Sequence, residues 1–150
     1  TDFGFLGTYN KNRGNIPFER FFLGGDGMMQ YALDGRETIA LRGYDNQSLS
    51  SRDGSVIYNK YSLELRYPIS LKPTASVFAL SFLEAGNGFD DFKDYSPFDV
   101  KRSAGIGVRV FMPAFGLLGI DFGYGFDTSN ISNTGQRSGW QTHFVIGQQF

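Results

Sequence analysis

The sequence predicts an all-β fold, part of an antiparallel transmembrane β-barrel, on the strength of three observations. Several segments alternate apolar and polar residues with the period of two that is typical of β-strands. The composition, with 20 Gly, 16 Phe and 8 Tyr among 150 residues, favours strands joined by turns over a helical bundle. The connections between the segments include both short turns and long polar loops, as they do in outer-membrane barrels.

Composition also excludes several classes of protein. A length of 150 residues fits one domain, and the net charge of −1 gives no sign of nucleic-acid binding. The absence of Cys excludes disulfides and thiolate metal sites. The longest apolar stretch, residues 108–120, is interrupted by Arg109, Pro113 and glycines, so we expect no membrane-spanning helix, which needs about 20 apolar residues. The chain begins without Met or a signal-peptide pattern, so we expect a processed protein or a piece of a longer one.

The first third of the chain reads as a strand end and a long loop. Residues 1–9 contain the end of a strand. Residues 10–58 are rich in Gly, Asp, Asn, Arg and Ser, and a loop of this length inside a compact domain is expected to have a function. Residues 59–150 then contain the last five strands of the predicted barrel portion.

The five strands have faces of different character. Residues 74–86 are apolar on both faces, with Phe82 and Glu84 sharing one of them. In the other four segments one face is almost purely aliphatic and aromatic, and we expect it to meet lipid. These faces comprise Tyr61, Leu63, Leu65 and Tyr67; Ala104, Ile106, Val108, Val110 and Met112; Leu118, Ile120, Phe122, Tyr124 and Phe126; and Trp140, Thr142, Phe144, Ile146, Gln148 and Phe150.

The connections and the opposite faces favour a membrane barrel over a soluble β-sandwich binding module. Residues 67–73 and 112–116 form short turns with Pro, whereas residues 87–100 and 128–139 are long and polar. A sandwich also alternates, but its outer face is polar. The opposite faces here carry Arg, Glu, Asp and a run of glycines, which suits a polar interior better than a packed core. Six segments cannot close a barrel, since the smallest use about eight, so further strands are expected in an N-terminal part or a partner chain.

Short motifs in a fixed order resemble a known family. The motifs are IPFERFFLGGDG with LRGYD, then LELRYPI, SFLEAGNGF, SAGIGVRVFMPAFGLLGIDFGY and the terminal HFVIGQQF. Over nearly the whole chain they resemble the C-terminal barrel part of the BamA family, the outer-membrane protein assembly factors. The long GG-to-RGY connection is similar to that of Bacteroidetes-type members. Two positions depart from the family pattern: the family's RGF reads Arg42-Gly43-Tyr44, and its barrel carboxylate is Glu84 rather than Asp.

The resemblance implies that the long loop folds into the barrel lumen and latches there. In the family, the loop arginine pairs with a carboxylate on the barrel wall, in a motif similar to Phe82-x-Glu84-x-Gly86. A guanidinium in a narrow lumen needs a bidentate acceptor, and a glycine lets the backbone approach the wall closely. A solvated loop charge is the alternative for Arg42. The expected latch, which is structural and gating rather than catalytic, comprises Arg42, Gly43, Tyr44, Phe82 and Glu84.

The resemblance also implies a seam at the last strand, at Gly147 and Phe150. Glycine inside a strand weakens it and permits a bend, although Gly147 could equally lie in a crowded part of the lumen. At an open seam, a client strand would pair with the exposed edge by β-augmentation.

Residues that suggest enzymes or metal sites do not form recognisable patterns. His143 is the only histidine, and no G-x-S-x-G motif accompanies it. The spacing of Asp90, Asp91, Asp94 and Asp99 does not match an EF-hand, so a solvated acidic loop is expected. We therefore expect no enzyme activity, no metal and no cofactor.

The expected function is that of the barrel subunit that folds and inserts outer-membrane β-barrel proteins through a lateral seam or gate. The alternative is a polypeptide-secretion or passive pore barrel of the same superfamily. The expected location is the outer membrane of a Gram-negative bacterium. The expected partners are nascent outer-membrane proteins, outer-membrane lipid, accessory lipoproteins and the remaining N-terminal part of the barrel, with no nucleic acid.

Overall fold

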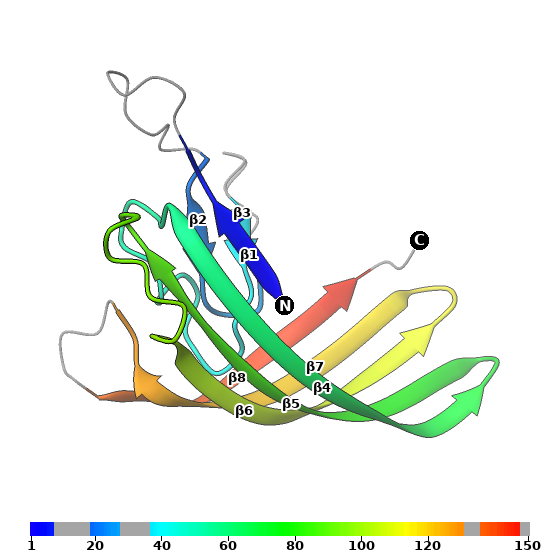
Figure 1. Ribbon diagram of the computed structural model, residues 1–150. Helices are drawn as coiled ribbons and strands as arrows, with labels where there is room; N and C mark the ends of the chain where they lie inside the picture. The colour runs from blue at the N-terminus through cyan, green and yellow to red at the C-terminus, as the bar shows by residue number, and fades with distance from the viewer. Residues whose placement is uncertain (8–18, 28–36, 131–135, 148–150) are drawn as a thin grey trace.

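A single curved antiparallel sheet dominates the protein (Figure 1). The computed structural model describes residues 1–7, 19–27, 37–130 and 136–147. Within these residues the six-stranded sheet has the order β1-β4-β5-β6-β7-β8, and a separate two-stranded sheet pairs β2 with β3. The small sheet lies on the concave side of the large one. The strands are β1 (Asp2–Phe5), β2 (Phe21–Leu23), β3 (Glu37–Ile39), β4 (Ile57–Lys72), β5 (Ala75–Phe89), β6 (Lys101–Met112), β7 (Gly116–Thr128) and β8 (Arg137–Gly147).

The long strands form a meander with short turns at one end and long connections at the other. Residues 73–74 join β4 to β5 and residues 113–115 join β6 to β7, whereas residues 90–100 join β5 to β6. The segment 67–73, expected as a turn, is mostly strand, since β4 continues to Lys72 through a register shift between Pro68 and Ser70. A proline cannot donate to the strand ladder, which is why it is found at such irregularities. In the part of the chain that is described, no helix is long and apolar enough to span a membrane.

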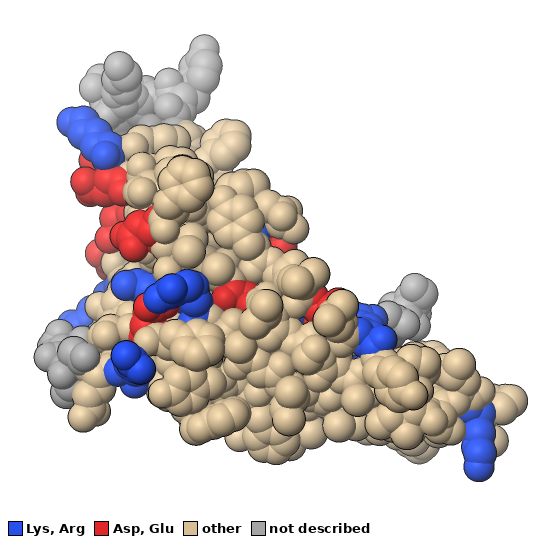
Figure 2. All heavy atoms as spheres, turned by 60° about the horizontal axis from the view of Figure 1, so that its bottom comes forward, with Lys and Arg blue, Asp and Glu red and all other residues tan. Residues whose placement is uncertain are grey.

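The convex face of the sheet is apolar, as the alternation predicts. Leu65, Trp140 and Ile146 expose 67%, 70% and 66% of their surfaces on it. Figure 2 shows this broad lower face as almost uniformly uncharged, with charged side chains gathered mostly toward the end that carries the long loops. A soluble sandwich would have a polar outer face here. The fold is therefore all-β, with the surface of a barrel portion whose outer wall meets lipid.

The segment 10–58, expected to be irregular, contains two short strands and a hydrophobic cluster of its own. β2 and β3 pair in parallel over three residues each, too short for an alternating pattern to reveal them. Leu23, Leu41, Tyr44 and Leu49 are fully buried and pack together with Tyr58 of β4. The Leu49 backbone N donates to the Leu23 carbonyl oxygen at 3.1 Å. The loop is thus a packed unit fastened to the concave side of the sheet.

The two faces of β8 give a test of the membrane assignment. Phe144 lies on the convex face and is 56% exposed, whereas Val145 points to the concave side. Phe144→Lys should destabilise the lipid-embedded barrel by roughly 2–4 kcal/mol if it lies near the bilayer midplane, and Val145→Lys by about 1 kcal/mol or less. Urea titration in lipid vesicles measures both. Equal losses at the two positions would contradict a lipid-facing convex surface.

Candidate functional site: the loop arginine and its carboxylates

The loop following β3 brings Arg42 against the concave wall, where it contacts Glu84 of β5. The Arg42 backbone N donates to Glu84 Oε2 at 2.8 Å, while its Nε and Nη2 donate to Oε1 at 3.0 and 2.6 Å. The Glu84 side chain is buried, with an exposed fraction of 3%, and the Arg42 side chain is largely buried, with 11%. One carboxylate therefore holds both the backbone and the side chain of the loop arginine.

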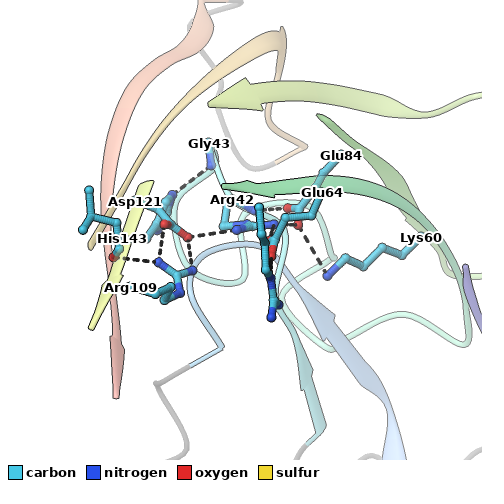
Figure 3. A network of polar contacts seen from close by, with 10 residues as sticks. Arg42, Gly43, Lys60, Glu64, Glu84, Arg109, Asp121 and His143 are labelled. Atoms are coloured by element: carbon cyan, nitrogen blue, oxygen red, sulfur yellow. Dashed lines mark hydrogen bonds and ion pairs between the residues drawn. The ribbon is translucent and has the colours of Figure 1, made fainter. Parts of the chain in front are cut away.

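Two further carboxylates approach the same guanidinium (Figure 3). Arg42 Nη1 lies 3.0 Å from Asp121 Oδ2 of β7, and Nη2 lies 3.0 Å from Glu64 Oε2 of β4. Asp121 is fully buried and also accepts from Arg109 Nη2 of β6 at 2.6 Å. Lys60 Nζ of β4 lies 3.9 Å from Glu84. From the exposed side, Arg66 Nε donates to Glu64 Oε1 at 2.6 Å. Four cations and three carboxylates thus compensate one another on the lumen wall.

The face of the Phe82 ring completes the surroundings of Arg42. The guanidinium carbon Cζ lies 3.8 Å from the centroid of this buried ring on β5, a cation–π contact that desolvation strengthens. Burial by itself lowers the pKa of Arg42, but the hydrogen bonds and charges of Glu84 and Asp121 outweigh it and raise the pKa. The arginine therefore stays charged in the lumen.

Gly43 lets the loop backbone lie directly on the wall. It has φ +88°, and a Cβ there would come 2.8 Å from Ser103 Cβ and 3.1 Å from Gly125 N. Its backbone N donates to His143 Nε2 of β8 at 2.8 Å. On the wall itself, a Cβ at Gly123 would come 2.7 Å from Gly43 N. Glycines on both partners are required for this close approach.

The other lumen-facing glycines accommodate large side chains. Gly107 and Gly119 lie directly opposite Asp121 and Arg109 in the β6–β7 ladder, where a Cβ would clash with these two side chains. A Cβ at Gly105 would clash with the Phe82 ring. The interpretation of the glycine run as the lining of a polar interior is therefore incomplete, since the loop backbone and the ion pairs pack closely on it.

Tyr44 anchors the loop at β6. Its fully buried hydroxyl donates to the Arg102 carbonyl oxygen at 2.7 Å. Burial raises the pKa of Tyr44, so the phenol stays protonated and remains a donor. The structure therefore brings Arg42, Gly43, Tyr44, Phe82 and Glu84 into one cluster.

Sequence reasoning missed several members of this cluster: Glu64, Asp121, Arg109, Lys60 and His143. The sequence pattern gives His143 no role, yet its Nε2 accepts the Gly43 amide hydrogen. The proximity of Arg109 and Asp121 could have been predicted from the sequence. The turn at residues 113–115 places Arg109 opposite Gly119, so Asp121 is its diagonal neighbour on the same face, within reach of a long side chain.

The predicted seam residues lie away from the cluster. Gly147 is the last residue of β8 and pairs with Leu117, while Phe150 lies outside the described residues. Within the described part of the chain, a Cβ at Gly147 would meet no heavy atom within 4 Å. Within the described residues, steric crowding therefore does not explain why position 147 is a glycine. The described residues also contain no group of three His, Cys, Asp or Glu side chains placed to hold a metal ion.

Comparison with known proteins identifies the domain. The family model described as the Omp85 superfamily domain matches residues 1–150, the full length of the chain given. No curated protein matches the chain.

The coupling between Arg42 and Glu84 is measurable. Arg42→Ala should weaken loop docking by about 3 kcal/mol, because it leaves buried carboxylates without their shared cation. Adding Glu84→Ala should cost much less than the sum of the two single changes. The exchange Arg42→Glu with Glu84→Arg should recover little, since Glu64 and Asp121 would then face a third carboxylate. Protease sensitivity of the loop reports docking, and strictly additive effects would contradict the contact.

The close approach of Gly43 has a matched control in Gly139. Both have positive φ, +88° and +74°, but a Cβ at Gly139 meets nothing within 4 Å in the described residues. Gly139→Ala should therefore cost about 1–2 kcal/mol of backbone strain, and Gly43→Ala roughly 1–3 kcal/mol more from overpacking. Urea unfolding combined with loop proteolysis measures the two variants. Similar costs would mean that the loop backbone does not rest on the wall.

Proposed function

Since the chain belongs to the Omp85 superfamily of outer-membrane barrels, which insert or secrete proteins, we propose that it is the C-terminal barrel part of a BamA-type assembly factor. In this role the barrel folds and inserts nascent outer-membrane proteins of a Gram-negative bacterium. It works by distorting the bilayer and opening a seam, without a catalytic residue, a nucleotide or a metal. Accessory lipoproteins and the N-terminal part of the barrel are its proposed partners.

One observation carries this proposal: the loop occupies the concave side of the sheet and is tied to all of its long strands. Polar contacts join residues 42–44 to Glu64 of β4, Glu84 of β5, Arg102 of β6, Asp121 of β7 and His143 of β8. A polypeptide moving through the lumen would have to displace this buried network, at the cost of leaving charges unpaired. A route along the side of the barrel leaves it intact, which supports insertion over secretion.

The position of β8 supports the same route. Within the described residues β8 is one of the two edge strands of the six-stranded sheet, and its outermost ladder pair is Gly147 with Leu117. An edge strand presents unpaired backbone groups that another strand can adopt. We propose that β8 forms one side of the seam, with Gly147 and Phe150 at its weak end.

Reconstitution tests this function directly. Vesicles containing the full-length protein should speed the folding of a urea-denatured outer-membrane barrel, measured as the appearance of its heat-modifiable band. Arg42→Ala and Glu84→Ala should slow folding several-fold while the protein itself still reaches the membrane. Vesicles that leave barrel folding unchanged but translocate a secreted passenger would instead establish the secretion barrel of the superfamily.

The substitution Gly147→Val tests the proposed role of Gly147 in the seam. Gly147 does not have a positive φ, so Gly147→Val fits the local backbone and should leave barrel stability within about 0.5 kcal/mol. Valine stiffens the strand end and should slow client folding several-fold. Thr142→Val, on the exposed face of the same strand, is the control and should have no effect. An unchanged rate in Gly147→Val would remove Gly147 from the seam.

A further inference from the structure

Two grooves join on the convex face, near the strand ends that carry the long loops. The larger, of about 1080 Å³, is lined in part by Arg102, Arg137 and Phe126. The smaller, of about 400 Å³, runs along β4, β5 and β6 between Leu65 and Ile106. Leu63 and Leu83 line both. The two grooves therefore form one continuous surface, called here the rim groove.

The end of the rim groove nearest the loops is basic. Lys101, Arg102 and Arg137 line it, against two carboxylates, Asp127 and the buried Glu84, and Glu84 is already paired with Arg42. Asp127 accepts from Arg102 Nε at 3.1 Å and from Nη2 at 3.0 Å, which holds the guanidinium in place. The Arg102 side chain is nevertheless 65% exposed, and a guanidinium has five N–H donors. This end thus carries a surplus of positive charge with a fixed, exposed donor group.

The other end of the rim groove is apolar and lies deeper along the strands. Leu65 and Ile106 form its walls and are 67% and 61% exposed, while Ser81 and Ala104 form a floor of small side chains. Arg102 pairs with Ala85 and Ile106 with Ser81 in the β5–β6 ladder. Four residues of strand, about 13 Å, therefore separate the basic end from the apolar end.

We propose that the rim groove binds one phosphate-bearing lipid from the leaflet on the long-loop side of the membrane. Its phosphate lies at Arg102 and Arg137, because a guanidinium matches phosphate oxygens with a planar pair of donors. One acyl chain lies in the groove between Leu65 and Ile106. Aromatic rings flank the basic end: Tyr124 stacks edge-to-face on Phe126 and on Trp140, both at 5.4 Å between centroids. Such rings collect at the level of lipid headgroups in membrane barrels, which places the phosphate at the right depth.

Native mass spectrometry of the full-length protein in detergent tests the proposal with two lipids that share their acyl chains. Dioleoyl phosphatidic acid should bind at least tenfold more tightly than dioleoyl phosphatidylcholine. Arg102→Gln with Arg137→Gln should remove this preference. Ser81→Phe, which fills the floor of the apolar end, should weaken the binding of both lipids. Arg137→Gln alone leaves the Arg102–Asp127 pair in place, so a loss of preference in that variant cannot be attributed to disruption of the pair.

Two controls match these changes elsewhere on the sheet. Arg66→Gln removes another exposed, ion-paired strand arginine, one that does not line the groove. Thr142→Phe adds the same ring to the convex face of β8. Neither should alter lipid binding. Equal affinities for the two lipids would overturn the proposal. So would competition by millimolar inorganic phosphate together with an unaffected Ser81→Phe variant, since that result describes an anion site without an acyl groove.

Discussion

The burial of one arginine in the lumen is the constraint on which the rest of this structure depends. A guanidinium removed from water is tolerated only when opposite charges and hydrogen-bond acceptors surround it. Arg42 receives them from Glu84, Asp121 and Glu64, which lie on three different strands. Because these carboxylates would repel one another without the cation, the wall and the loop stabilise each other. The docked loop therefore contributes to the stability of the barrel wall, although in the sequence it only connects two strands of the large sheet.

Close packing of the loop requires a wall with small residues in defined places. Gly123 and Gly125 leave room for the backbone of Gly43, and Gly107 and Gly119 leave room for the Asp121–Arg109 pair. Glycine weakens a strand, so a wall with this many glycines loses intrinsic strand stability. The hydrogen bonds and ion pairs of the docked loop offset that loss. The convex face of the same wall stays apolar. Because side chains alternate along a strand, each strand can pack against the loop with one face and present apolar side chains with the other.

Most of what could be predicted of the fold came from the alternation of apolar and polar residues with a period of two. It assigned Phe144 and Ile146 to the convex face and put Phe82 and Glu84 on one shared face, and the structure has both pairs so placed. That the shared face of Phe82 and Glu84 is the lumen wall was implied by the family resemblance. Family resemblance, not periodicity, suggested that Arg42 lies near Glu84. The β2–β3 pair and the hydrogen bond from Gly43 to His143 could not be read, because three-residue strands have no measurable period and the latter contact spans 100 positions. Long-range pairs of this kind depend on where the loop docks, which no local pattern encodes.

Amide hydrogen exchange at Arg42 and Gly43 tests the central claim most directly. The first amide donates to Glu84 and the second to His143, so both should exchange as slowly as amides inside β5–β7 when the full-length protein is embedded in lipid. Glu84→Ala should speed exchange at both positions together, because the carboxylate holds the loop as a unit. Exchange at Arg42 and Gly43 in the wild-type protein as fast as in an open, solvated loop would contradict a docked latch.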